Sequence, residues 1–201
     1  METEKSPIIA DGFCIEFNPE LWQFYKPDLP QKGAKVKLKP DFEAIAKLIK
    51  GSKCVDLIGV YKNTYAFLIE CKKFTAAGQA GQNPKPSYRA TLKDNYESIP
   101  QKMRDSLAAI LKGARNSSHE REFFQNFVKC FQNADFFACL WVIHNKSKLQ
   151  DKHNLDEKNV LDDELTKNLS WLDAQKATII ITSDNLSNFT AQFEGLTITI
   201  Q

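Results

Sequence analysis

Long apolar runs are missing from this sequence of 201 residues. The longest, residues 136–143, has eight residues, whereas a membrane-spanning helix needs about 20. The five Cys and three His residues form neither a Cys-x-x-Cys pair nor a zinc-site spacing. The polar N-terminus, Met-Glu-Thr-Glu-Lys, contains no apolar leader. These absences predict a reduced, cytoplasmic protein without a membrane segment, in which most cysteines are small core residues.

The composition is that of an ordinary folded protein. Hydrophobic residues make up 42% of the chain and charged residues 26%, which is close to the globular average. Disordered, collagen-like and coiled-coil proteins are therefore poor matches. A chain of this length buries enough apolar surface to fold without disulfides or a structural metal. We interpret residues 1–201 as a single domain.

Charge is distributed unevenly along the chain. Residues 26–150 carry 22 Lys or Arg against 11 acids, a net charge of +11. The flanking residues 1–25 and 151–201 have net charges of −4 and −5. A basic centre between acidic ends is compatible with a polyanionic partner, and equally with an ordinary solvated surface. Charge alone therefore does not assign a nucleic-acid ligand.

The N-terminal third contains weak signals of regular structure. Residues 8–17 alternate loosely, which predicts a strand, and residues 19–26, which include Trp22, Phe24 and Tyr25, are interpreted as a short helix. Residues 27–40 are interpreted as a lysine-rich connector. A helix capped by Asp41 is predicted over 42–50, because its apolar residues follow helical spacing.

The middle of the chain predicts a β-hairpin followed by helices. Two strands rich in Val, Ile, Tyr and Phe, 53–61 and 64–70, flank a two-residue turn at 62–63. Residues 74–95 are interpreted as a long loop. Ser98 and Pro100 predict the start of a helix that ends at Gly113.

The remaining elements complete an α/β pattern. Ser117 and Glu120 have the spacing of a capping box, which predicts a helix to about residue 132. Residues 135–144 are nearly all apolar, so they predict a buried central strand. One more helix and two more strands are predicted, over 161–172, 177–182 and 196–200. We therefore expect an α/β fold with a central mixed sheet, a β-hairpin and flanking helices.

Three charged residues of the predicted hairpin could meet at its open end. Asp56 lies in the first strand, and Glu70 and Lys72 end the second on one face, with Cys71 on the other. Two carboxylates at one sheet end suit Mg²⁺, which takes oxygen ligands. A nearby ammonium can stabilise charge that develops in a reaction. The alternative is an ion pair at the sheet edge between these acids and Lys72 or Lys73.

This arrangement resembles the PD-(D/E)XK nuclease superfamily, which includes restriction endonucleases and many repair nucleases. The resemblance rests on Asp56 in KCVDLIGV and on Glu70-x-Lys72 in AFLIECKKF, and it covers residues 41–144. Val55 stands where the superfamily motif has Pro. The resemblance implies a restriction endonuclease-like core over 41–144, with an N-terminal extension, 1–40, and C-terminal elements, 145–201.

The resemblance also implies roles for individual residues. Asp56 and Glu70 would bind Mg²⁺ or Mn²⁺, joined by the backbone carbonyl of Cys71 and by Glu43 on the preceding helix. Lys72 would assist the attacking water. Gln101 or Lys102, on the helix after the motif, would join the catalytic site. Further basic residues would contact DNA phosphates: Lys35, Lys37, Lys39, Lys73 and Arg89.

Each assignment has a plainer alternative. Glu43 could be an exposed helix residue, and Gln101 and Lys102 could be a solvated helix flank. The lysines of the connector could be simple solubilising charge. Arg104 and Asp105 are interpreted as a surface or structural pair.

We therefore expect a Mg²⁺-dependent nuclease that hydrolyses DNA, in which a metal-bound water is the nucleophile. The second hypothesis is a catalytically silent nucleic-acid-binding or assembly subunit with the same fold. A third is a structural protein in which the motif is a coincidence. A homodimer or a partner protein is compatible with all three.

Overall fold

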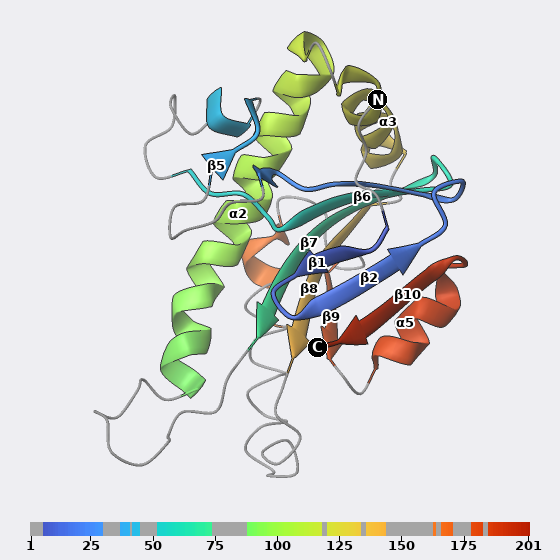
Figure 1. Cartoon of the computed structure of the whole chain (residues 1–201). Helices are drawn as coiled ribbons and strands as arrows, with labels where there is room; N and C mark the ends of the chain where they lie inside the picture. The colour runs from blue at the N-terminus through green and yellow to red at the C-terminus, as the bar shows by residue number, and fades with distance from the viewer. Residues whose placement is uncertain are drawn as a thin grey trace.

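The chain folds into an α/β structure with one five-stranded mixed sheet and a smaller three-stranded sheet (Figure 1). A computed structural model describes residues 6–29, 37–40, 42–44, 52–73, 88–117, 120–133, 136–143, 163, 166–170, 178–182 and 185–201. Among the helices of these residues, none is both long and apolar enough to span a membrane. The predicted α/β class is confirmed.

The five-stranded sheet has the order β3-β6-β7-β8-β9. Its strands are β3 (Trp22–Tyr25), β6 (Leu57–Tyr61), β7 (Tyr65–Lys73), β8 (Phe136–Ile143) and β9 (Thr178–Thr182). Strand β6 is antiparallel to both β3 and β7, whereas β8 is parallel to both β7 and β9. The predicted central mixed sheet is therefore present, and the strand predicted over 135–144 lies inside it.

The faces of this sheet are covered by different layers. Helices α2 (Tyr88–Asn116) and α3 (Arg121–Gln132) pack on one face, against side chains such as Ile58 and Leu68. The other face packs against β1 (Ile8–Ala10), β2 (Phe13–Phe17), β10 (Leu196–Ile200) and α5 (Leu186–Gln192). Adjacent strand residues point to opposite faces. Leu57 therefore packs in the core against the three-stranded sheet, and Ile58 packs in the core under α2 and α3.

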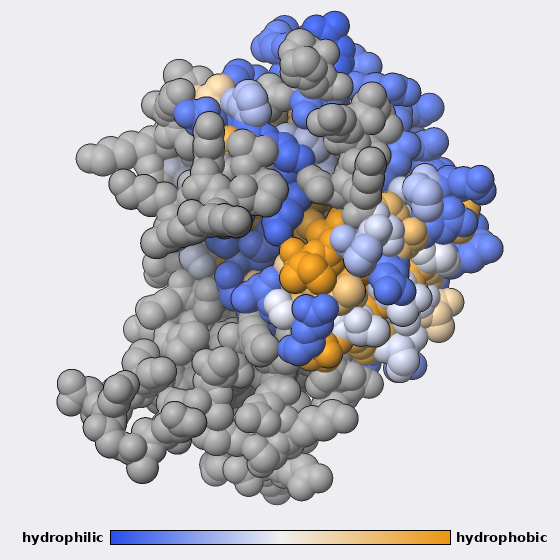
Figure 2. Space-filling model, in the orientation of Figure 1, coloured by the Kyte–Doolittle hydropathy of each residue, from blue (hydrophilic) through white to orange (hydrophobic). Residues whose placement is uncertain are grey.

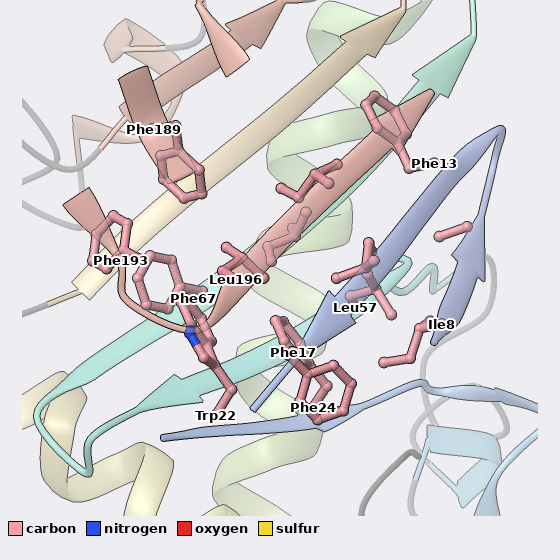
Figure 3. Close-up of a cluster of buried hydrophobic side chains, with 14 of the residues drawn as sticks. Ile8, Phe13, Phe17, Trp22, Phe24, Leu57, Phe67, Phe189, Phe193 and Leu196 are labelled. Carbon is pink, nitrogen blue, oxygen red and sulfur yellow. The ribbon is translucent and has the colours of Figure 1, made fainter. Parts of the chain in front are cut away.

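The core between the two sheets is rich in aromatic rings (Figure 3). Trp22 stacks on Phe24 at 5.1 Å between centroids, and its indole Nε1 donates to the carbonyl of Glu194 at 3.0 Å. The outer face of the three-stranded sheet is partly apolar (Figure 2), and Ile9, between the buried Ile8 and Ala10, is 47% exposed there.

The β6–β7 hairpin is confirmed, with its turn at Lys62 and Asn63. Both residues have positive φ values, 48° and 52°, and the Thr64 amide donates to the Tyr61 carbonyl at 2.9 Å. Three residues, 62–64, separate the paired strand ends, one more than predicted. The ladder extends from Tyr61↔Tyr65 to Leu57↔Ile69. The strand expected from residue 53 begins only at Leu57, because the amides of Lys53 and Val55 bind side chains of α2 instead.

Two N-terminal predictions were wrong. Residues 8–17 form two strands, because Asp11 and Gly12 make a tight turn with φ values of 41° and 86°. The aromatic residues expected to form a helix are strand β3 instead. Strand alternation places Trp22 and Phe24 in one core and Tyr25 in the other, which buries all three rings. Within 27–40, β4 (Asp28–Leu29) pairs with β5 (Lys37–Leu38).

Helix α2 is longer than predicted at both ends. It begins at Tyr88, inside the expected loop, and Ser98 and Pro100 lie within it instead of starting it. No Gly or Pro occurs between residues 88 and 99, so nothing there breaks the helix. At the other end α2 continues to Asn116, past Gly113. A Cβ at Gly113 would lie 2.4 Å from Cδ2 of Phe124, so this glycine permits the close packing of α2 on α3.

The remaining predictions are largely confirmed where the structure describes them. Ser117 Oγ accepts from the Glu120 amide at 3.0 Å and donates to its carboxylate at 3.3 Å, before α3 begins at Arg121. Strand β9 (Thr178–Thr182) lies within the predicted 177–182, of which residue 177 is outside the described residues, and β10 matches the predicted 196–200. Helix α5 was not predicted. Two further helices were predicted, over 42–50 and 161–172. The described residues 42–44, 163 and 166–168 are α-helical, and 169–170 are not. The other residues of these two ranges lie outside the described part of the chain.

Candidate active site

Asp56 and Glu70 lie opposite each other at the open end of the hairpin. The antiparallel ladder ends at Leu57↔Ile69, and the next pair of positions is Asp56 and Glu70. Opposite residues of an antiparallel pair share a face of the sheet. The predicted antiparallel pairing, with both acids on one face of the sheet, agrees with this register.

Glu70 is fully buried and binds two lysines. Its Oε1 accepts from the Nζ of Lys72 at 2.6 Å and from the Nζ of Lys102 at 2.5 Å. The two lysine side chains are 26% and 19% exposed, whereas that of Glu70 is 0% exposed. Within the described part of the chain, Oε2 of Glu70 is buried without a hydrogen-bond partner. A buried carboxylate oxygen normally has a hydrogen-bonding or ligand partner, and among the described residues this one has none.

Electrostatics couple these groups to one another. Burial raises the pKa of Glu70 above its ordinary value, as does repulsion from Asp56, while Lys102 and Lys72 oppose the shift. Burial acts against the charge of Lys72, but attraction to Glu70 and Asp56 outweighs it and raises the pKa of Lys72. Lys72 therefore stays an ammonium at neutral pH.

Asp56 is held by the backbone of the neighbouring strand. Its Oδ2 accepts from the Cys71 amide at 2.7 Å, and its side chain is half-buried. The Cys71 side chain belongs to the core on the opposite face, so the prediction that it points away from the acids is confirmed. Burial raises the pKa of the Cys71 thiol well above its ordinary value, which keeps the thiol protonated.

Two further acids lie near this pair and were missed by sequence reasoning. Asp28 of β4 interacts electrostatically with Asp56. Burial is the main cause of the raised pKa of Asp28, and repulsion from Asp56 raises it further. Cys54 Sγ donates to Oδ1 of Asp28 at 3.6 Å. Asp11, in the β1–β2 turn, contributes to the raised pKa of Lys72. No local signal pointed to Asp28, because only long-range folding brings β4 to the hairpin.

Two other predicted site residues lie on helical segments. Gln101 is half-buried on α2, one residue before Lys102. Glu43 is half-buried in a helical turn, where its amide donates to the Lys39 carbonyl at 2.9 Å. In the described ranges, no three His, Cys, Asp or Glu side chains form a group that could hold a metal ion, so Glu43 does not complete a three-ligand set.

The predicted phosphate-binding residues are only partly described. Lys39 places its Nζ 4.2 Å from the ring centroid of Tyr25, a cation–π contact that fixes this charge on the helix-covered side of β3. Lys35 lies outside the described residues, as do the side chains of Lys37, Lys73 and Arg89. The basic groups that the structure places at the acids are Lys72 and Lys102.

The donor set is suited to a hard cation. Mg²⁺ is usually bound in proteins by one or two carboxylates, with water and phosphate oxygens completing its shell. Asp56 and the free Oε2 of Glu70 supply two carboxylates of this kind. The arrangement therefore fits Mg²⁺ or Mn²⁺, held by few protein ligands.

The chain matches no protein-family model, and neither the curated proteins nor the solved structures contain a significant match to it. Any functional conclusion therefore depends on the geometry of the site.

Proposed function

We propose that this chain is a Mg²⁺-dependent nuclease that hydrolyses DNA phosphodiester bonds, with a restriction endonuclease-like core. The observation that carries the proposal is the buried carboxylate of Glu70. It lies opposite Asp56, its Oε1 is bound by two ammonium groups, and its Oε2 has no partner in the described part of the chain. Two acids and two lysines at one sheet end are the groups that metal-assisted phosphodiester hydrolysis needs.

The order of elements supports the same proposal. A helical turn at 42–44 precedes the β6–β7 hairpin, and α2, α3 and the parallel strand β8 follow it. This is the helix, hairpin, helix and strand order expected over residues 41–144 from the resemblance to the PD-(D/E)XK superfamily. The parallel pairing of β8 with β7 places β8 beside the strand that carries Glu70.

The residues have distinct roles in the proposed reaction. Asp56 and the free oxygen of Glu70 would hold Mg²⁺ or Mn²⁺. When bound, the metal would acidify a water molecule and neutralise charge on the phosphate. Lys72 is the more exposed of the two lysines on Glu70, so it is the group that reaches substrate, orients the attacking water and stabilises the developing negative charge. Lys102 holds the Glu70 carboxylate in its orientation.

A catalytically silent nucleic-acid-binding subunit is the second candidate. The observation that favours it is the sharing of one Glu70 oxygen by two ammonium groups. The two ammonium groups together balance the negative charges of Asp56 and Glu70. In an active site, a divalent ion would balance these charges instead. In that case the four groups would be a structural ion network, and Lys72 would contribute only positive potential toward DNA.

A cleavage assay tests the proposal. Supercoiled plasmid and a labelled single-stranded oligonucleotide are incubated with the purified full chain in Mg²⁺, in Mn²⁺ and in EDTA. We expect cleavage only with a divalent ion and none by Glu70→Gln. Glu194→Gln is the matched control, because it makes the same change at an exposed acid that pairs with Lys62 away from the site. Cleavage by Glu70→Gln at the wild-type rate would assign the activity elsewhere.

A further inference from the structure

The segment that leads into Asp56 is held by a helix instead of by a strand. The Lys53 amide donates to Oδ2 of Asp105 at 3.1 Å, and the Val55 amide donates to Oγ of Ser106 at 2.9 Å. Val55 and Ser106 are fully buried, and Asp105 is nearly so. Because the β6–β7 ladder ends at Leu57, these two bonds fix the backbone immediately before Asp56.

One face of α2 therefore holds both acids of the candidate site. Lys102, Asp105 and Ser106 are spaced i, i+3 and i+4, so they lie on the same side of the helix. Lys102 binds the carboxylate of Glu70 directly. Asp105 and Ser106 hold the backbone that carries Asp56. The separation between the two acids is thus set by a rigid helix as well as by the hairpin.

Asp105 is fully engaged in this task. Its Oδ1 accepts from both Nε and Nη2 of Arg104, at 3.0 and 2.9 Å, and its Oδ2 is used by Lys53. The pairing with Arg104 compensates a carboxylate that is only 3% exposed. Of the two alternatives for Arg104 and Asp105, the structural pair is the one observed.

We propose that Ser106 and Asp105 are positioning residues, which set the metal affinity of the site by fixing the place of Asp56. They act through the backbone of residues 53–55 and contribute no ligand themselves. Partners that orient metal ligands commonly change metal affinity by about 10- to 100-fold when they are lost. The metal-affinity part of this inference rests on the proposed function, whereas the placement of Asp56 does not.

The test compares Ser106→Ala with Ala109→Gly. Both change a fully buried small residue of α2, but only the first removes an acceptor from residues 53–55. In Ser106→Ala we expect the Mg²⁺ concentration for half-maximal cleavage to rise by about 10- to 100-fold, with most of the rate restored at saturating metal. We expect Ala109→Gly to lose a similar amount of thermal stability to Ser106→Ala. Its Mg²⁺ concentration for half-maximal cleavage should nevertheless equal that of wild type.

A metal-free measurement makes the inference independent of activity. The Cys71 amide is bound by Asp56, so its hydrogen exchange reports where Asp56 lies. We expect exchange at Cys71 to accelerate in Ser106→Ala more than in Ala109→Gly, whether or not the chain cleaves DNA. Equal Cys71 protection in the two variants would overturn the positioning role. An inert wild type with accelerated Cys71 exchange in Ser106→Ala would retain that role and remove the proposed function alone.

Discussion

The Nζ of Lys102 on α2 lies 2.5 Å from Oε1 of Glu70 at the end of β7. The contact joins the helical layer to the central sheet at the point where the hairpin ladder ends. Together with Lys72, it compensates a carboxylate whose side chain is 0% exposed. The acids of the candidate site therefore depend on packing between the helical layer and the sheet.

Replacing Glu70 by Gln should change the pH dependence of stability. Burial and Asp56 raise the pKa of Glu70 above 4.5, so the folded state holds this proton more tightly than the unfolded chain. The resulting stabilisation is complete below pH 4.5 and is lost as pH rises through the raised pKa. Urea unfolding across this interval should show wild type losing stability relative to Glu70→Gln as pH rises. Parallel curves would contradict a raised pKa.

Replacing Lys72 by Met should slow cleavage without removing the metal. The substitution keeps an unbranched side chain but loses the ammonium that stabilises developing charge. We expect the rate at saturating Mg²⁺ to fall by about 10²–10³-fold, the loss typical of a missing charge-stabilising donor. Calorimetric titration with Mn²⁺ should give an affinity close to that of wild type. A large loss of Mn²⁺ affinity would instead place Lys72 among the groups that organise the ligands.

Replacing Lys102 by Met should shift the pH profile of cleavage. Lys102 is the larger of the two lysine contributions that oppose the raised pKa of Glu70, so its loss should raise that pKa further. Protons then compete with metal for the carboxylate up to a higher pH. The acid limb of the rate profile should therefore move to higher pH, measured with Lys112→Met, another lysine of α2, as the control. An unmoved acid limb would show that another group controls it.

Gly113→Ala should destabilise the protein although it replaces a helical glycine. In an exposed helix this change adds about 0.5–1 kcal/mol of stability. Here the new Cβ would lie 2.4 Å from Cδ2 of the buried Phe124 ring, so α2 and α3 must separate or the ring must move. We expect a net loss of about 1–3 kcal/mol in urea unfolding, as for other overpacked cores. A stability gain would show that the ring adjusts freely.

The sequence predicted the hairpin well, because local patterns determine it. The register, however, was not determined by the predicted turn: a two-residue turn at 62–63 would pair Tyr61 with Thr64, whereas the ladder pairs Tyr61 with Tyr65 and so brings Asp56 opposite Glu70. Strand β3 was mistaken for a helix because its aromatic side chains divide between two cores. Only the presence of a second sheet explains that division, and the second sheet pairs β2 with β10 from the other end of the chain.

The charged surroundings of the site were harder to predict. Lys102 was a candidate by its place after the motif, but only the packing of α2 on the sheet brings it to Glu70. Asp28 and Asp11 reach the site from a two-residue strand and from a tight turn, where nothing in the neighbouring sequence indicates a role. Local periodicity carries no information on contacts of this kind, which depend on the tertiary fold.

DNA binding should be separable from cleavage by Asp56→Asn. This variant should lose Mg²⁺-dependent cleavage, because the amide is a poor substitute for a carboxylate ligand. In EDTA it should bind a labelled oligonucleotide at least as tightly as wild type, since one acid fewer repels the phosphates. The slope of log affinity against log salt should be unchanged between about 50 and 200 mM, because that slope counts phosphates neutralised by Lys and Arg, none of which is removed.

Fluorescence anisotropy over that salt range, with cleavage measured on the same preparations, separates the two candidate functions. Lys72→Met is the control, because losing an ammonium near the phosphates should reduce the salt slope, whereas Asp56→Asn should not. A wild type that binds DNA with a steep salt dependence but cleaves none in Mg²⁺ or Mn²⁺ would be the silent subunit. Cleavage by Asp56→Asn at the wild-type rate would place the reaction away from the hairpin. Binding without salt dependence would remove DNA as the ligand of this surface.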